Sequence, residues 1–409
     1  MLSKEERNKK EIIGMCVKRK ITAKDAAQRL SLSVRQVENL KKKQREGISL
    51  LHGNCGHSSA KALSTETKQS ILRNYEKVSK LGTINFTHFH EILQEQEVNV
   101  SYTAMRNVLV QAGNISPKKR RSKKQKHATR ERRQKFGELL QTDATPFDWF
   151  QTGETFALHG FIDDARGVIT GLYISKNECM TGYLEAFRQT LTDYGTPEAI
   201  YADGLSIFFA KKKAEELTLE EELSGLVVRK TQFGQICDTL GVALIHARSS
   251  QAKGRVERLW ETLQSRLPIE FAMRGIKTAE AANIFLRDEY RFTFNTHFGV
   301  NASAKSCFVP LPESVSLDRL LSYKITRTLD NGGCFSLHSV RFRVEGMLAK
   351  CRVTLLISNR LGMVAEHEGL LYDVIPLTFK NENIASTDSV DAIFSRFVFL
   401  FCLKNEHVA

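Results

Sequence analysis

Three acidic side chains lie where carboxylates can act together in phosphoryl chemistry. Asp143 lies near the end of one predicted strand and Asp203 ends another, whereas Glu257 lies one turn into a predicted helix. Mg²⁺ prefers carboxylate oxygens and keeps water and phosphate as its other ligands. Two such ions can activate the attacking oxygen and stabilise the leaving oxygen of an in-line displacement. The three acids therefore predict a site for two Mg²⁺ or Mn²⁺ ions. The alternative is solvated surface carboxylates, because a chain with 46 acids offers many such triples.

Four segments around these acids occur in a fixed order. They are QTDATPFDW (141–149), FIDDARG (161–167), YADG (201–204) and HARSSQAKGRVER (246–258). Together with LHGN (51–54), they resemble the integrase core of DDE transposases, most closely the ISNCY-type bacterial insertion-sequence transposases, over roughly residues 15–375. The resemblance implies an RNase H-like core in which Asp143, Asp203 and Glu257 are the catalytic, metal-binding triad.

The resemblance also implies an activity and its partners. The expected enzyme hydrolyses a phosphodiester at the ends of an element in double-stranded DNA, and the freed 3′-hydroxyl then attacks target DNA. The expected active form is a homo-oligomer on paired ends. The sequence departs from the family pattern at Ser250, where Pro is usual, and at Gly204 and Leu205, which replace bulkier polar residues. The alternative function is therefore a catalytically decayed transposase that acts only as a DNA-binding regulator.

The elements that must position the acids form a predicted mixed α/β domain over 136–300. Three antiparallel strands precede alternating helices and strands, which is typical of a mixed sheet. The strands are expected at 136–145, 156–163, 168–174, 199–203 and 242–247, and the helices at 181–194, 233–240 and 251–273. Asp163 and Asp164 fall in a predicted hairpin turn, where aspartate is locally favoured, so a structural role is expected for both.

The register of the helix over 251–273 decides which glutamate completes the triad. At 100° per residue its buried stripe is formed by Val256, Leu259, Trp260, Leu263 and Leu267. Glu257 then lies at the rim of the packed face, whereas Glu261 points further outward. The helical register therefore favours Glu257 over Glu261.

The positive charge of the chain is concentrated in its first third. Residues 1–135 hold 31 Lys and Arg against 12 Asp and Glu, whereas the remainder holds 29 against 34. This asymmetry is expected when one region binds a polyanion. No run of about 18 apolar residues is present, so nucleic acid is favoured over a membrane as the partner.

Residues 1–50 are predicted to form a helix-turn-helix domain of three helices. Thr22 and Ser33 are the predicted caps of the second and third helices. The third helix is expected to turn Val34, Val37 and Leu40 inward and its polar side chains toward DNA, namely Arg35, Gln36, Asn39 and Lys42. The alternative is a small three-helix bundle with no role in DNA binding.

A similar pattern recurs over 60–115 and predicts a second helix-turn-helix or winged-helix-like domain. Helices are expected at 65–80, 87–93 and 102–113, the last capped by Ser101. Its candidate DNA contacts are Tyr102, Thr103, Arg106 and Asn107. Two tandem units favour a bipartite reader of DNA.

A basic linker over 116–135 joins these units to the core. Such an arm binds phosphates without sequence preference. The predicted DNA contacts outside the two helical units are Lys118, Lys119, Arg120, Arg121, Lys253 and Arg255.

The remaining features complete the expected layout. Residues 320–380 are predicted to form a small C-terminal β-barrel, and 381–409 a tail without a predicted role. The eight cysteines are scattered and contain no CxxC pair, which favours free thiols in a reducing compartment. The N-terminus lacks an apolar signal segment, so the expected location is the cytoplasm, in association with the nucleoid.

Overall fold

The computed structural model describes residues 4–50, 63–117, 131–209, 230–247, 254–301, 303–337, 340–346, 350–358 and 360–378. The chain divides into two compact units, residues 1–69 and 70–409. Among the described residues, no helix is long and apolar enough to cross a membrane. The cysteines in this part of the chain are all free thiols.

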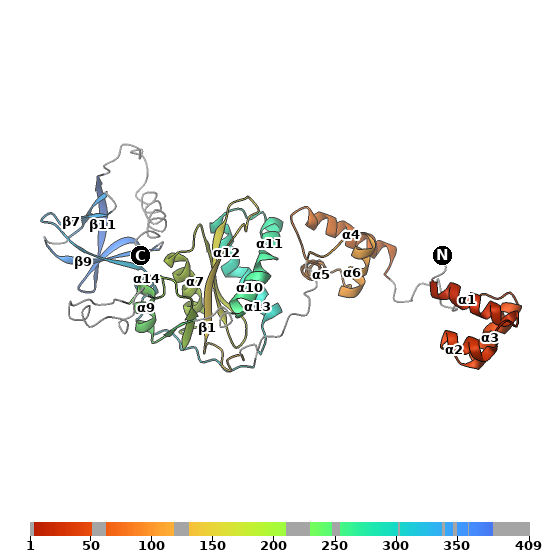
Figure 1. Cartoon of the computed structure of the whole chain (residues 1–409). Helices are drawn as coiled ribbons and strands as arrows, with labels where there is room; N and C mark the ends of the chain where they lie inside the picture. The colour runs from red at the N-terminus through yellow and green to blue at the C-terminus, as the bar shows by residue number, and fades with distance from the viewer. Residues whose placement is uncertain are drawn as a thin grey trace, which may run out of the picture. The chain divides into compact units, whose positions relative to one another are not determined.

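The first unit contains the predicted three helices, α1 (Lys4–Val17), α2 (Ala23–Leu30) and α3 (Val34–Arg45) (Figure 1). Thr22 and Ser33 cap α2 and α3 as predicted, and each belongs to a capping box that satisfies two backbone donors. Ile13, Ala26 and Val37 form the centre of its small core. Val34 was predicted to face inward, but it is 47% exposed. The prediction is wrong here because Val34 is the first helical residue and lies beyond the packed stripe.

The next three helices are α4 (Thr65–Ser79), α5 (Phe86–Glu95) and α6 (Tyr102–Gln111). Asn85 caps α5, and Ser101 caps α6 as predicted. Their buried side chains include Ile71, Phe89 and Leu109. The three helices agree with the prediction to within a few residues at each end.

The central sheet has five strands, β1 (Leu140–Phe147), β2 (Phe156–Asp163), β3 (Ile169–Ser175), β4 (Ala199–Ala202) and β5 (Ala243–His246). Their order across the sheet is β3-β2-β1-β4-β5. The pairs β1–β2 and β2–β3 are antiparallel, whereas the pairs β1–β4 and β4–β5 are parallel. The predicted mixed α/β sheet is confirmed.

Helices cover both faces of this sheet (Figure 1). On one face, α7 (Met180–Asp193) and α9 (Gln232–Leu240) pack through Tyr183, Phe187 and Phe233. The other face carries a second core built around Leu158, Leu172 and Trp260. The elements of that face are α10 (Gly254–Gln264), α11 (Leu267–Arg274), α12 (Ala279–Phe285), the π-helix η3 (Leu286–Tyr290) and α13 (Arg291–Phe298).

The single helix predicted over 251–273 is two helices in the structure. α10 ends at Gln264, and α11 begins at Leu267 with Pro268 in its first turn. Proline lacks the amide hydrogen that a continuous helix needs and clashes with the preceding turn, so it is tolerated only at a helix start. The residue that directly precedes α11 is Arg266, which is 7% exposed.

The C-terminal region is a six-stranded antiparallel sheet that follows the short helix α14 (Leu317–Leu320). Its strands are β6 (Tyr323–Thr328), β7 (Cys334–Leu337), β8 (Val340–Val344), β9 (Arg352–Ser358), β10 (Gly362–His367) and β11 (Leu370–Thr378). They surround one apolar cluster that includes Phe342 and Leu355. The order is β6-β9-β10-β11-β8-β7, so in the described part the edge strands β6 and β7 do not pair. The sheet is therefore barrel-like, as predicted, without a closing ladder between β6 and β7 in the described residues.

Candidate active site

Asp143 lies on β1, and Asp203 directly follows the end of its parallel neighbour β4, at the same level. Leu140 pairs with Ile200 and Gln141 with Tyr201. Asp143 and Asp203 each lie three residues beyond the first of these pairs, so both chains have advanced by the same distance. Adjacent strands are about 4.8 Å apart, and side chains alternate in step along each of them. The sheet therefore brings together two acids that are 60 residues apart in the sequence.

Helix α10 is fixed alongside β1 by three hydrogen bonds at regular intervals. The Val256 amide donates to Gln141 Oε1 at 3.3 Å, Trp260 Nε1 to Asp143 Oδ2 at 3.2 Å, and Gln264 Nε2 to Thr145 Oγ1 at 3.0 Å. Four helical residues rise about 6.0 Å and two strand residues about 6.6 Å. The two repeats match, so α10 and β1 run side by side in the same direction.

The match of α10 with β1 brings Glu257 alongside this strand. Its neighbour Val256 is bonded to β1 beside Gln141, and Trp260, one turn later, is bonded to Asp143. The predicted buried stripe of α10 and α11 is confirmed, because its five residues all belong to one core cluster. Glu257 and Glu261 are both exposed, so exposure alone does not separate them. The two glutamates differ in their position relative to Trp260, which bonds to Asp143. Glu257 lies about one turn before Trp260 on α10, whereas Glu261 directly follows it.

A buried tyrosine lies close to both aspartates. The hydroxyl of Tyr183, on α7, donates to Glu178 Oε1 at 2.5 Å. Burial, followed by the charges of Glu178, Asp143 and Asp203, raises the pKa of Tyr183 well above its ordinary value of 10.0. The phenol therefore stays neutral and adds no negative charge beneath the carboxylates.

His159 supports this tyrosine from β2. Its ring contacts the Tyr183 ring edge-on at 4.7 Å, and its Nε2 accepts the Cys179 amide at the start of α7 at 3.1 Å. Complete burial lowers the pKa of His159 to about 4, so its imidazole is neutral near pH 7. His159 is thus a structural group that joins β2 to α7.

Asp163 and Asp164 have structural roles, as predicted. Both are fully buried, and Asp163 accepts the Gly137 and Arg166 amides at 2.9 and 2.6 Å. Asp164 accepts Gln141 Nε2 at 2.9 Å and Arg255 Nε at 2.5 Å. This acid therefore ties the start of α10 to β1, two residues before each of the candidate ligands Asp143 and Glu257.

The pairing with Asp164 changes the assignment of Arg255. The sequence predicted that Arg255 contacts DNA, yet its side chain is 14% exposed and ion-paired inside the core. The contact joins residues 91 positions apart, and no local sequence pattern signals it. We therefore leave Arg255 out of the DNA surface proposed below.

The three acids supply the hard oxygen donors that Mg²⁺ and Mn²⁺ prefer. Asp143 and Asp203 come level on the sheet, with Glu257 on the adjoining helix. Within the described part of the chain, no three His, Cys, Asp or Glu side chains are gathered closely enough to hold a metal ion. The donor chemistry of the three acids fits a divalent cation.

Two helices present the polar faces predicted to contact DNA. On α3, the predicted contacts Arg35, Gln36, Asn39 and Lys42 are all exposed, and only Val37 is buried on this helix. Gln36 Oε1 also accepts the Ser33 amide at 2.9 Å. On α6, Tyr102, Thr103, Arg106 and Asn107 lie apart from the buried Met105 and Leu109. The other predicted contacts, Lys118, Lys119, Arg120, Arg121 and Lys253, lie outside the described residues.

Sequence comparison supplies close relatives. No protein-family profile matches the chain. The chain is 33% identical over 372 residues to the transposase for insertion sequence IS1202 of Streptococcus pneumoniae, covering 83% of this chain and 77% of that protein. It is 32% identical over 327 residues to a putative transposase of Sinorhizobium fredii, covering 78% of this chain and 67% of the relative.

Comparison with solved structures finds viral integrases. The simian T-cell lymphotropic virus intasome in complex with PP2A regulatory subunit B56 gamma covers 68% of this chain and 89% of that chain, at 15% identity and a TM-score of 0.28. The dimeric HTLV-2 integrase catalytic core with magnesium covers 38% of this chain and 90% of that chain, at 17% identity and a TM-score of 0.26. At these scores the structural likeness adds nothing to the sequence match.

Proposed function

Because the chain belongs to the insertion-sequence transposases, we propose that it binds the ends of its own element, cleaves the DNA there and joins the ends to target DNA. The order of its motifs favours the ISNCY type within that family. The strand order β3-β2-β1-β4-β5, with three antiparallel strands followed by two parallel ones, supports an RNase H-like catalytic core.

We assign Asp143, Asp203 and Glu257 as the DDE triad. The observation that carries this assignment is the level placement of Asp143 on β1 and of Asp203 just beyond β4, with α10 fixed against β1 through Trp260. Two divalent cations, Mg²⁺ or Mn²⁺, would supply activation of the attacking oxygen and stabilisation of the leaving oxygen. The carboxylates would hold the ions, and Trp260 orients Asp143 by donating to one of its oxygens.

The proposed reaction has two balanced steps. In the first, water attacks a phosphodiester at the element end, the P–O3′ bond breaks, and the products are a 3′-hydroxyl and a 5′-phosphate. In the second, that 3′-hydroxyl attacks a phosphodiester of the target, so one P–O bond forms as another breaks. No further co-reactant is needed, because the first step consumes only water and the second exchanges one ester oxygen for another.

Recognition of the ends is assigned to the polar faces of α3 and α6. Arg, Asn and Gln side chains on such a helix can reach base edges, whereas Lys118–Arg121 supply phosphate contacts without sequence preference. We propose that the active form is a homo-oligomer that pairs two ends, working on chromosomal DNA in the cytoplasm.

The test is cleavage of a supercoiled plasmid that carries the inverted repeats flanking the gene. Mg²⁺ or Mn²⁺ should support cutting at the repeat ends. Ca²⁺ should allow binding with little chemistry, because it takes more ligands at longer distances. A decayed regulator would bind the repeats and leave the plasmid uncut with every ion. Full cleavage in the presence of a chelator would contradict a carboxylate–metal mechanism.

A further inference from the structure

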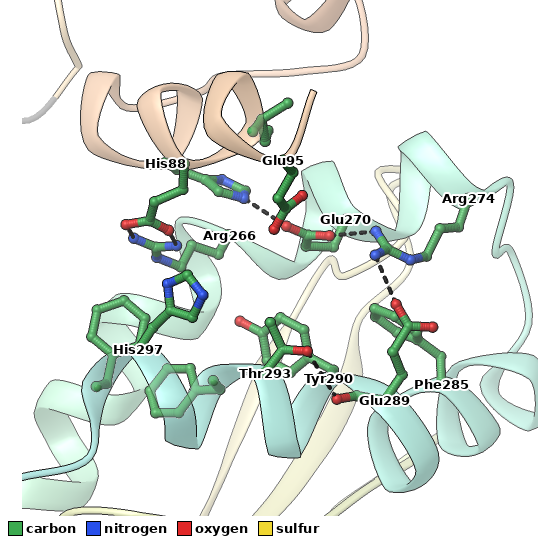
Figure 2. Close-up of a pocket in the computed structure, with 14 residues that line it drawn as sticks. His88, Glu95, Arg266, Glu270, Arg274, Phe285, Glu289, Tyr290, Thr293 and His297 are labelled. Carbon is green, nitrogen blue, oxygen red and sulfur yellow. Dashed lines mark hydrogen bonds and ion pairs between the residues drawn. The ribbon is translucent and has the colours of Figure 1, made fainter. Parts of the chain in front are cut away.

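Helix α5 is held against the catalytic core by two polar pairs, each with one buried member, Arg266 or His88 (Figure 2). Both guanidinium Nη atoms of Arg266 donate to the carboxylate of Glu91, one of them at 2.9 Å, and these side chains are 9% and 20% exposed. Nearby, His88 Nε2 bonds to Glu270 Oε1 at 2.7 Å, with His88 only 2% exposed. A bidentate arginine–carboxylate pair fixes both distance and orientation, unlike a flexible surface pair.

The core members of these two pairs, Arg266 and Glu270, also contact other side chains of the core. Arg274 bridges Glu270 and Glu289, the second of these contacts at 3.0 Å. The Arg266 guanidinium also lies over the Phe298 ring, 4.7 Å from its centroid. The contact therefore engages α11, η3 and α13 together, and so it is anchored in several elements of the core.

The chain before α5 adds a third point of contact. Gly82 lies so close to the core that an added Cβ would come within 2.6 Å of Gln151 Oε1. Gln151 itself donates to the Pro268 carbonyl at 3.1 Å. Three separate contacts on one side of a small helical module leave it little freedom to rotate on the core.

Helix α6 is joined to α5 by contacts separate from these pairs. His90 Nε2 bonds to the Val100 carbonyl at 2.7 Å, and its ring contacts Tyr102 edge-on at 5.9 Å. The polar face of α6 takes no part in the two polar pairs. The module thus presents one face to the core and leaves another face accessible to DNA.

Arg266 lies next to the helix that carries the candidate ligand Glu257. It lies two residues beyond α10, the helix that carries Glu257 and whose Trp260 bonds to Asp143. A continuous path of packed elements therefore runs from the catalytic carboxylates through α10 and Arg266 to Glu91, α5 and α6.

We propose that the pairs Glu91–Arg266 and His88–Glu270 are positioning residues that set where the DNA is cut. By fixing α6 relative to Glu257, they fix the number of nucleotides between the sequence read by α6 and the phosphodiester that reaches the carboxylates. This inference rests on the proposed function, in which α6 binds the element end and the core cleaves it. It adds a specificity determinant that touches neither DNA nor metal.

The test maps cut positions at nucleotide resolution on an end-labelled terminal repeat, with the full chain. Glu91→Arg places like charges together, and removing the partner of a buried charge is strongly unfavourable. This variant should cut at several neighbouring phosphodiesters, with at least about tenfold less product at the native position. Its affinity for the repeat should stay within about twofold of wild type. The double variant Glu91→Arg with Arg266→Glu should bring cutting back toward the native position.

Two further variants keep the test decisive. Glu76→Arg breaks the surface pair with Lys80, whose side chains are about 70% exposed, and should cut as wild type does. Glu91→Gln keeps the shape of the side chain in case the charge reversal lowers folding yield, and melting curves report the folded fraction of each protein.

Unchanged cut positions in folded Glu91→Arg would overturn the proposal. Faster cutting by that variant at the native position would also overturn it, because the contact would then be inhibitory. A wild-type protein that binds the repeat without cutting it would instead contradict the proposed function, on which this inference depends.

Discussion

At the residue scale, the candidate site depends on partners that hold the carboxylates as much as on the carboxylates themselves. Asp143, Asp203 and Glu257 were predicted because the motifs around them resemble a transposase core, whereas acid chemistry alone does not single them out among 46 acids. Trp260 was predicted only as a member of the buried stripe. Its bond to Asp143 spans 117 residues and follows from how α10 lies on β1, which no local pattern encodes.

Trp260→Phe should reduce cleavage by about tenfold or more and raise the Mg²⁺ concentration needed for half-maximal rate. Phenylalanine keeps an aromatic ring in the core but removes the indole donor, and hydrogen bonds to charged groups contribute about 1.5–3 kcal/mol. Tryptophan fluorescence gives a second readout, because the chain has 2 Trp residues. The emission change on metal titration should disappear in this variant.

Trp149→Phe is the matched control for that measurement. Trp149 lies in the same core cluster, and its Nε1 donates to the Phe156 carbonyl at 2.9 Å, away from the acids. It should lower stability and leave the metal requirement unchanged. An equal shift in Mg²⁺ requirement for both variants would mean that Trp260 acts only through packing.

The lowered pKa of His159 predicts how the stability of the protein depends on pH. Its folded pKa is lowered to about 4 from 6.5, so its contribution is complete above about pH 6.5 and is lost as the pH falls toward 4, by about 3 kcal/mol. Asp163 changes stability with pH in the opposite direction. Burial raises its pKa to about 6 from 3.8, so its contribution is lost as the pH rises through that range.

A comparison of wild type with His159→Gln isolates the first effect, since Asp163 is common to both proteins. The variant should be less stable at pH 7 because the contacts with Cys179 and Tyr183 are altered. The difference in the free energy of unfolding, measured with urea, should shrink between pH 6.5 and 4.5. A difference that stays constant over this range would contradict the neutral, buried imidazole.

At the element scale, most helices and strands could be located from the sequence because caps and apolar periodicity are local signals. Thr22, Ser33 and Ser101 cap the helices for which they were predicted. The helix predicted over 251–273 is broken before Pro268, and the prediction is wrong because the apolar periodicity continues through the break. The docking of α5 through Glu91 and Arg266 was beyond prediction, because it joins residues 175 positions apart.

The two polar helix faces and the basic linker should contribute differently to DNA binding. Arg35→Ala or Arg106→Ala should lower preference for the terminal repeat by about 1–3 kcal/mol relative to unrelated DNA, since each removes a potential base contact. Alanine at Lys118, Lys119, Arg120 and Arg121 should weaken binding to all sequences alike. It should also flatten the slope of log K against log salt by about 0.9 for each phosphate that is no longer neutralised.

Competition binding at two or more salt concentrations separates these effects. Lys43→Ala on α3 is a control, because Lys43 is exposed but outside the predicted recognition set. If the Arg35 and Arg106 variants bound all sequences with equally reduced affinity, the assigned recognition faces would be wrong.

At the scale of the whole molecule, a basic front third is joined to a mildly acidic remainder that contains the five-stranded sheet. This division was readable from composition alone, and it agrees with a front that binds a polyanion and a core that performs chemistry. The barrel-like C-terminal sheet was also expected from its strand pattern. Its unpaired edges were not, because β6 and β7 are consecutive strands that a short turn would be expected to pair, yet β6 pairs with β9 and β7 with β8.

The central claim is that Asp143, Asp203 and Glu257 form one metal-dependent catalytic centre. It is tested most directly by the variants Asp143→Asn, Asp203→Asn and Glu257→Gln in the plasmid assay, with Glu261→Gln as the matched control from the same helix. Each triad variant should lose cleavage and strand transfer by about a thousandfold or more while binding the repeat nearly as wild type does, because the amide keeps the shape and removes the ligand charge. Glu261→Gln should retain most activity. An active Glu257→Gln beside an inactive Glu261→Gln would contradict the assignment.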